Sequence, residues 1–290
     1  MKTVPQAFYE AAAIEKIMVD GLSSIIYKEV ETAALDNNRF VATPALTMVL
    51  EGVLQITTYE GEVIRVSDKE MVLIPKGIYM ISDIIPLGSK FKAIVFFFEE
   101  KLISEFLNEL SPFKDEVNVS GLNLFKRSQS IDIYIDALMK LYRGQKSNKP
   151  FTNVKLFELL HLLALTKEGP SFINALRALE NRTRKNVAQF MNSNFDKPLS
   201  IEDYAYLTGR SISTFSRDFK RQFGCAPKQW LIDRRLEKAI EIFKAGNSSV
   251  TQTAFEVGYE NLSHFIKVFR KRYGLSPKQY ILQNRKELVV

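Results

Sequence analysis

The C-terminal third of the sequence contains one pattern twice, and this repeat is the strongest constraint on the fold. Residues 223–230 read FGCAPKQW, and residues 273–280 read YGLSPKQY, fifty positions later. Upstream of each fragment, aromatic residues recur at every fourth position, which puts them on one face of a helix. They are Phe215, Phe219 and Phe223 in the first copy and Phe265, Phe269 and Tyr273 in the second. The repeat therefore predicts two copies of one small helical unit, with Phe215, Phe219, Phe265 and Phe269 in the cores.

Within each copy, the local signals predict a helix, a short turn and a second helix. A serine precedes the first helix as a candidate N-cap, and a glycine ends each helix, where a left-handed residue is favoured. The two units are expected at about residues 200–224 and 249–274. Their second helices are expected to begin at Ser211 and Asn261. Residues 230–246 carry apolar residues at helical spacing and predict a linker helix between the units.

Two helices joined by a glycine-containing turn, with basic residues on the second, are typical of the helix-turn-helix motif. The second helix of this motif enters the major groove of DNA. If the linker helix holds both second helices on one side of a duplex, they would enter successive groove segments about 34 Å apart. A single chain could then read both segments.

The distribution of charge agrees with a nucleic-acid partner at this end. Residues 182–290 contain 20 Lys and Arg against 10 Asp and Glu, a net charge of +10, whereas residues 1–181 contain 20 against 23, a net charge of −3. A basic domain joined to a slightly acidic one favours a polyanion partner for the basic domain. We therefore predict two domains, residues 1–181 and 182–290.

The N-terminal domain has a different pattern. From about residue 23 to residue 98, short β-rich segments alternate with turn residues, which indicates an antiparallel sandwich or a small barrel, and a jelly-roll-like barrel is expected. Helical periodicity follows at 99–110, 130–142 and 153–166. The last of these is apolar over more than one face. This fits packing against a second subunit as well as ordinary core packing within one subunit.

Several classes of protein are disfavoured by the sequence. No apolar run approaches the roughly 18 residues that span a bilayer, so no membrane partner is expected. The N-terminus does not resemble a signal peptide and the chain has one cysteine, which together favour the cytoplasm. No phosphate-binding glycine loop, Ser-His-Asp set or Cys-His pair is visible, so no catalytic residue is predicted and the chain is not expected to be an enzyme.

At this point the motifs resemble a known family. Residues 186–285 resemble the DNA-binding domain of the AraC/XylS family of bacterial transcription regulators. The resemblance is carried by SIEDYAYLTGRSISTFSRDFKRQFGCAPKQWL in the first half and VTQTAFEVGYENLSHFIKVFRKRYGLSPKQYI in the second. More loosely, residues 23–98 resemble the family's cupin-type barrel, which is followed by helices that commonly dimerise. The implied fold class is α+β, with an N-terminal cupin-like antiparallel β-barrel with helices and a C-terminal all-α domain of two helix-turn-helix units.

The resemblance also implies which residues contact DNA. In this family, base-edge contacts come from the N-terminal part of each second helix, and further basic residues on that helix contact phosphates. The positions that correspond to base contacts are Ser213, Ser216 and Arg217 in the first unit and Ser263, His264 and Lys267 in the second. The expected phosphate contacts are Lys220, Arg221, Arg270, Lys271 and Arg272. Arg and Lys can donate to guanine, and Ser and His can pair with several base edges.

Some of these residues have a plainer interpretation. Without the paired repeat, Arg217 and Lys267 would be read as part of a solvated helix face, and the repeat reverses that preference. His264 fits a DNA contact and an ordinary exposed histidine equally well. Cys225 aligns with Leu275, so a small buried side chain is expected there. Because residues 1–160 contain no histidine, a cupin-type metal site would lack its usual ligands, and no metal or other cofactor is predicted.

The leading hypothesis is a sequence-specific transcription regulator, expected to be an activator, that binds double-stranded promoter DNA. The resemblance also implies RNA polymerase and a homodimer as partners. The N-terminal domain would receive a signal, either a small molecule inside the barrel or a regulatory protein outside it. The apolar strands favour the protein slightly, since they can fill their own interior. The alternative is a cupin-type ligand-binding protein or enzyme whose basic domain attaches to nucleic acid without sequence preference.

Overall fold

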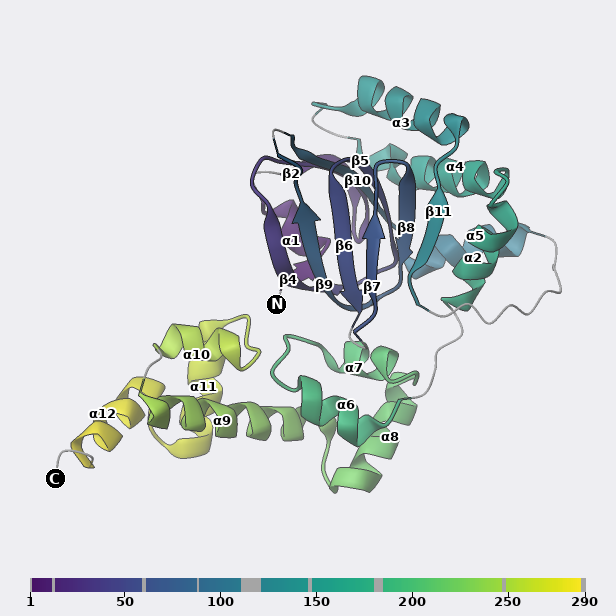
Figure 1. The fold of residues 1–290 in the computed structure, drawn as a ribbon. Helices are drawn as coiled ribbons and strands as arrows, with labels where there is room; N and C mark the ends of the chain where they lie inside the picture. The colour runs from purple at the N-terminus through teal and green to yellow at the C-terminus, as the bar shows by residue number, and fades with distance from the viewer. Residues whose placement is uncertain are drawn as a thin grey trace. The chain divides into compact units, whose positions relative to one another are not determined.

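The computed structural model describes residues 2–11, 14–58, 61–87, 89–110, 121–145, 148–179, 185–246 and 249–287 (Figure 1). The chain divides into two compact units, Met1–Asn181 and Arg182–Val290. The domain boundary expected between residues 181 and 182 lies in the segment 180–184, outside the described residues. Among the helices that are described, none is long and apolar enough to cross a membrane.

The first unit is built around two β-sheets. One sheet has the strand order β1-β4-β9-β6-β7, and the other has the order β11-β8-β5-β10-β3-β2. Their bounds are β1 Lys2–Val4, β2 Ile14–Asp20, β3 Ser23–Val30, β4 Ala34–Val41, β5 Ala45–Glu51, β6 Val53–Thr58, β7 Val63–Val66, β8 Glu70–Ile74, β9 Gly77–Ile84, β10 Phe91–Phe97 and β11 Asn123–Lys126. The pairings are antiparallel except for β1, which runs parallel to β4.

The two sheets are not closed into the barrel that the sequence predicted. In the described part of the chain, strands of one sheet pair only with strands of the same sheet, so the unit is an open sandwich. Successive strands from β3 to β6 fall in alternate sheets, as in a jelly roll. Inward and outward residues alternate along strands of sandwiches and barrels alike, which is why the sequence pattern could not separate the two.

The six-stranded sheet is buried on both faces. Along β10, Ala93, Val95 and Phe97 belong to the core between the sheets. The alternate residues Ile94 and Phe96 belong to a second core, beneath the helices. The helices are α2 Glu100–Glu109, α3 Gln129–Tyr142, α4 Thr152–Ala164 and α5 Gly169–Ala178, and a short α1 spans Gln6–Tyr9. Figure 1 shows α3, α4, α5 and α2 on the side of the six-stranded sheet that faces away from β6 and β9.

Helix α4 packs against this core with most of its apolar residues, since Leu160 is fully buried there and Phe157 and Leu162 pack against it. Leu156, Leu159 and Leu163 are also fully buried in the core. On the opposite side, Val154 and Leu165 are 61% and 84% exposed. The apolar residues that the sequence showed on more than one face of this helix therefore fall into two groups. Most pack into the core of the first domain, and a few are exposed to solvent.

In the described residues of the second unit, all regular secondary structure is helical. The helices are α6 Val187–Asn194, α7 Ile201–Leu207, α8 Ile212–Phe223, α9 Pro227–Ala245, α10 Val250–Glu256, α11 Leu262–Tyr273 and α12 Pro277–Glu287. The pairs α7/α8 and α10/α11 are the two predicted helix-turn-helix units, and α9 is the predicted linker helix.

The predicted helix ends are confirmed. Ser200 and Asp203 form a complete capping box at α7, and Ser249 caps α10. Gly224 and Gly274 end α8 and α11 with φ of 74° and 77°, a left-handed conformation that favours glycine. The expectation for Cys225 is wrong in part, because this side chain is half-buried instead of fully buried.

Candidate nucleic-acid interface

The second helix of each unit begins at a side-chain cap. The Ser211 hydroxyl accepts a hydrogen bond from the Thr214 backbone N–H at 3.3 Å, and the Asn261 side chain accepts one from the His264 N–H at 2.9 Å. Both caps are the residues that the sequence predicted. The cap satisfies a backbone N–H that would otherwise have no partner, so the first turn is ordered where the family's base contacts originate.

Helix α8 is divided sharply between a buried and an exposed face. Phe215 and Phe219 are fully buried, with ring centroids 5.8 Å apart. Ser213 and Arg217 are exposed, and Ser216 is partly exposed. The aromatic residues form the core of the unit, as the sequence predicted, and leave the polar side chains on the accessible face.

Helix α11 repeats this arrangement. Phe265 and Phe269 are fully buried, while Ser263, His264 and Lys267 are exposed. The ring of His264 lies 5.7 Å from that of Tyr259, which restricts its orientation. Among the residues that the structure describes, neither Arg217 nor Lys267 forms an ion pair, although the Arg217 charge helps to lower the pKa of Asp218, so both cations are available to a ligand.

The five residues expected at phosphates are all exposed: Lys220, Arg221, Arg270, Lys271 and Arg272. Two of them also have partners within the unit. Arg221 lies 3.4 Å from Asp218, and Arg272 lies 3.4 Å from Asp233 of α9. These exposed pairs are weak, so a phosphate could compete for either guanidinium.

Sequence reasoning missed Arg210, which holds the connection between α7 and α8 in place. Arg210, between α7 and α8, donates to the carbonyl oxygens of Thr208 and Lys185 and to Asp218 of α8. The Arg210 hydrogen bond is the main reason why the pKa of the Asp218 carboxyl lies below its usual value. Arg210 had no signal of its own in the repeat, because its counterpart in the second copy is a tyrosine.

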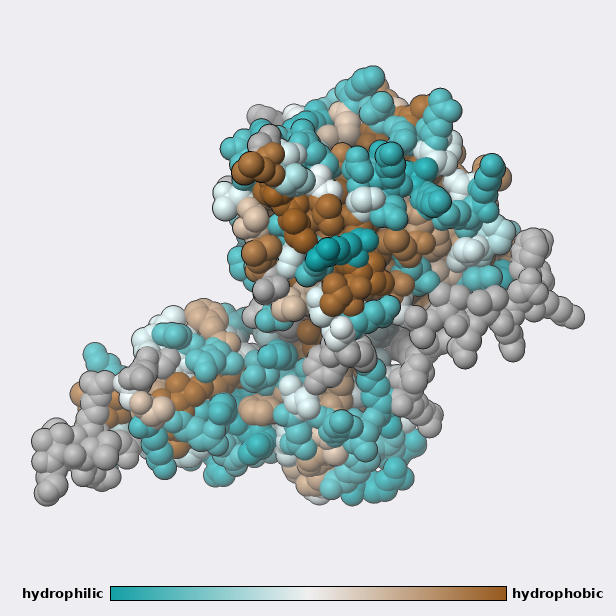
Figure 2. Space-filling view, viewed as in Figure 1, coloured by the Kyte–Doolittle hydropathy of each residue, from teal (hydrophilic) through white to brown (hydrophobic). Residues whose placement is uncertain are grey.

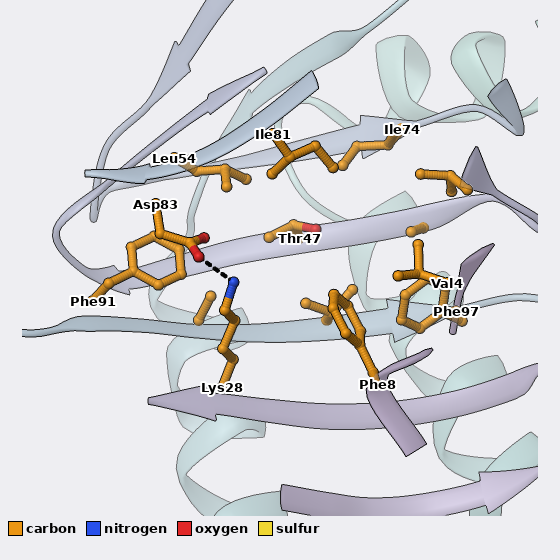
Figure 3. Close-up of a pocket in the computed structure, with 14 residues that line it drawn as sticks. Val4, Phe8, Lys28, Thr47, Leu54, Ile74, Ile81, Asp83, Phe91 and Phe97 are labelled. Atoms are coloured by element: carbon orange, nitrogen blue, oxygen red, sulfur yellow. Dashed lines mark hydrogen bonds and ion pairs between the residues drawn. The ribbon is translucent and has the colours of Figure 1, made fainter. Parts of the chain in front are cut away.

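The N-terminal sandwich contains a second candidate site, a small cavity between the sheets (Figure 3). Apolar side chains from both sheets line it, and Lys28 of β3 reaches across to pair with Asp83 of β9. The free space is about 40 Å³, enough to hold at least one water molecule. One carboxylate oxygen of Asp83 has no hydrogen-bond partner among the described residues.

Burial dominates the electrostatics of this cavity. Desolvation lowers the pKa of the Lys28 ammonium, and the Asp83 charge opposes that shift. Two aromatic rings, Phe8 and Phe91, lie 5.9 and 5.3 Å from the Lys28 nitrogen. Across the described residues, no group of three or more His, Cys, Asp or Glu could hold a metal ion.

The outer face of the five-stranded sheet is partly apolar. Figure 2 shows brown surface over the strands β6, β7 and β9. Val53, Ile78 and Met80 are partly exposed there, and Val63 is 55% exposed. An apolar sheet face without a covering helix is a common feature of surfaces that contact other proteins.

The two capped, amphipathic second helices with outward cations define a protein with paired helix-turn-helix units. Comparisons with known proteins agree. The family described as ExsA N-terminal regulatory domain matches residues 44–175, and the family described as helix-turn-helix domain matches residues 204–283. The chain thus combines an AraC-type helix-turn-helix domain with an N-terminal domain of the ExsA type, and the relatives it matches are AraC-family transcription regulators.

Individual relatives are distant. The chain is 28% identical over 151 residues to the virulence regulon transcriptional activator VirF of Yersinia enterocolitica, covering 52% of this chain and 56% of that protein. It is 28% identical over 111 residues to the HTH-type transcriptional regulator ExsA of Pseudomonas aeruginosa, covering 38% and 40%. The chain thus spans about half the length of the curated relatives it matches. An apo ToxT variant from Vibrio cholerae has 12% sequence identity and a TM-score of 0.45, covering 91% of this chain and 98% of that one.

Proposed function

We propose that this chain is a sequence-specific, DNA-binding transcription activator whose N-terminal unit receives a signal. The observation that carries the proposal is the repeated arrangement of α8 and α11. Each helix begins at a side-chain cap, buries two phenylalanines and presents an unpaired cation at the same position, Arg217 or Lys267. Double-stranded promoter DNA is the proposed partner, and the cytoplasm is the proposed location.

The proposed base contacts are the outward residues of the first two turns of each helix. They are Ser213, Ser216, Arg217, Ser263, His264 and Lys267. The proposed phosphate contacts, Lys220, Arg221, Arg270, Lys271 and Arg272, follow on the later turns. Cations close to the backbone position the helix, whereas those at the groove floor select bases.

For the N-terminal unit, residues 1–181, we propose a sensory and dimerisation role. The cavity at Lys28 has about 40 Å³ of free space, against the roughly 300–1,000 Å³ of ordinary small-molecule sites. This supports a regulatory protein over a small molecule as the signal. The exposed apolar residues on the five-stranded sheet favour the same choice.

The test is selection of duplexes from a random pool by the full chain, followed by affinity measurements at one fixed salt concentration. A specific regulator should bind its selected duplex at least about 1,000-fold more tightly than random DNA. Addition of that duplex upstream of a core promoter should then raise transcript yield with RNA polymerase. Equal affinity for selected and random duplexes, with a steep dependence on salt, would instead indicate non-specific attachment.

A further inference from the structure

The two helix-turn-helix units touch each other directly, in addition to being joined by α9. The contact lies between the loop after α6, residues 195–200, and the turn between α10 and α11. Gly258 in that turn has a φ of +90°, and a Cβ atom added there would lie 2.7 Å from the carbonyl oxygen of Asp196. Glycine is therefore required at position 258 for two reasons. Its backbone is left-handed, and a second backbone segment approaches it too closely for a Cβ atom.

Arg235 of α9 closes the same contact from another side. Its Nε–H donates to the carbonyl oxygen of Phe195 at 2.7 Å, and its Nη2 donates to that of Lys197 at 2.6 Å. Its guanidinium also lies 5.7 Å from the centre of the Tyr259 ring. The planar guanidinium thus contacts the backbone of the first helix-turn-helix unit and a ring of the second, with two donors in a fixed geometry that a lysine lacks.

Tyr259 belongs to the interior of this joint. It is 5% exposed, and its ring lies 5.2 Å from that of Phe265 in the core of the second unit. Its hydroxyl has no hydrogen-bond partner in the described part of the chain, and burial raises its pKa to about 12. The ring therefore connects the α11 core to Arg235.

The joint uses positions at which the two copies of the repeat differ. Gly209 and Gly258 correspond, and the next residues are Arg210 and Tyr259. Arg210 turns back to Asp218 within its own unit, whereas Tyr259 faces Arg235. A helix-turn-helix unit does not need a buried tyrosine here for its own fold, because the first unit lacks one. The departure from the repeat is explained by contact between the units.

We infer that Arg235, Gly258 and Tyr259 are positioning residues that fix the rotation and separation of α8 and α11, so that the chain accepts two half-sites at only one spacing. The inference rests on the proposed function, since it concerns how the two recognition helices share one duplex. Helix α9 packs into the second unit through Leu236 and Phe243 and contacts α8 through Trp230, and the joint adds a further point of attachment away from the helix axis. Contacts on both sides of the joint restrict rotation of one helix-turn-helix unit against the other.

The first test uses the full-length chain and its selected duplex, with one or two base pairs inserted or removed between the half-sites. One base pair moves a half-site by about 3.4 Å and turns it by about a tenth of a helical turn. A fixed joint cannot follow this change, so we expect affinity to fall roughly 10–100-fold for a single base pair. Equal affinity at three neighbouring spacings would overturn the inference without any variant.

The second test compares Arg235→Ala with Lys238→Ala, which removes the same charge from the same helix. The Lys238 amine pairs only with Glu241 on α9, at 2.9 Å, among the described residues. In Arg235→Ala the affinity ratio between native and altered spacing should fall to below about 3-fold, because the freed units can adapt. Lys238→Ala should keep the ratio of the unaltered chain. An unchanged ratio in folded Arg235→Ala contradicts the role of this residue.

Gly258→Ala provides an independent variant, with Gly274→Ala as its control. Gly274 has a similar φ of +77°, but an added Cβ would meet nothing within 4 Å. Both changes strain the backbone, and only Gly258→Ala pushes the two units apart. Loss of spacing preference in Gly258→Ala alone supports the inference, and loss in both or in neither contradicts it. Fluorescence of Trp230, the one tryptophan of the chain, reports whether each variant is folded.

The outcomes separate the two proposals. A full chain that prefers no duplex over random DNA overturns the proposed function and the inference with it. A chain that selects a bipartite site but tolerates altered spacing keeps the proposed function and loses the inference.

Discussion

Equivalent residues of the two repeats are alike where they face inward, whereas several residues on the accessible side differ. Phe215 and Phe265 are both fully buried, because each unit needs the same core. On the accessible side, Arg217 corresponds to Lys267 and Thr214 corresponds to His264, while Ser213 and Ser263 are the same. Divergence on one face of two otherwise similar helices fits recognition of two different half-sites.

Replacement of Arg217 or Lys267 by alanine should relax base preference. We expect each change to reduce the free energy of binding to the selected duplex by about 1–3 kcal/mol, if the cation binds a base edge. Affinity for random DNA should change much less. Titrations of both duplexes at one salt concentration measure the difference. Arg221→Ala is the matched control, since loss of a phosphate contact should weaken binding to both duplexes equally. If Arg217→Ala also weakened binding to both duplexes equally, Arg217 would be a phosphate contact instead of a base contact.

The buried pair of Lys28 and Asp83 should be intolerant of half-removal. Asp83→Asn leaves a lysine in an apolar cavity without its counter-charge, so we expect a loss of about 3–5 kcal/mol in the free energy of unfolding. The double change Lys28→Met with Asp83→Leu should cost far less, because neither charge remains to be desolvated. Urea unfolding followed by circular dichroism measures both. The control is Lys92→Met, which breaks a more exposed pair with Glu51 and should reduce the free energy of unfolding less than Asp83→Asn does. An equal reduction for both variants would mean that burial of the Lys28–Asp83 pair has no special effect.

At the scale of single elements, local sequence signals located the helices of the second unit well. Caps, terminal glycines and four-residue spacing act within one or two turns, so they can be read without knowing the tertiary fold. The strands were harder. β4, with the sequence ALDNNRFV, carries a weak strand signal of its own because Asp and Asn are rare in strands, and it is held in the sheet by pairing with β9.

The cap of α8 should contribute to stability separately from DNA binding. Ser211→Ala removes the acceptor for the Thr214 N–H, and we expect a loss of about 0.5–2 kcal/mol in the free energy of unfolding. Ser213→Ala removes an exposed hydroxyl that lies 3.1 Å from the Ser211 hydroxyl but leaves the cap acceptor in place, so it should cost less stability than Ser211→Ala and weaken binding to the selected duplex. Denaturant unfolding followed by Trp230 fluorescence is suited to this comparison, since that ring lies 5.7 Å from Phe219 of α8. Equal unfolding free energies for the two variants would argue against the cap.

At the scale of the whole molecule, the charge asymmetry between residues 1–181 and 182–290 supports the proposal that residues 182–290 bind DNA. Each cation that neutralises a phosphate should contribute about one unit to the slope of log K against log salt concentration. We therefore expect Lys220→Ala and Lys271→Ala each to reduce the magnitude of that slope by about one. Lys101→Ala serves as control, because this exposed lysine lies in the acidic first unit. An equal change for Lys101→Ala would mean that the first unit also contacts DNA.

The sequence by itself determined the repeat, the helix boundaries of the second unit, the buried aromatic face and the outward cations of α8 and α11. These features depend on interactions between residues a few positions apart. Only the tertiary structure decided that the N-terminal strands form two open sheets and that Lys28 meets Asp83, 55 residues away. The tertiary structure also decided that Arg235 and Gly258 bring the two helix-turn-helix units into contact. Such contacts join segments distant in sequence, and they are selected by packing and pairing in three dimensions, which leave no periodic signal along the chain.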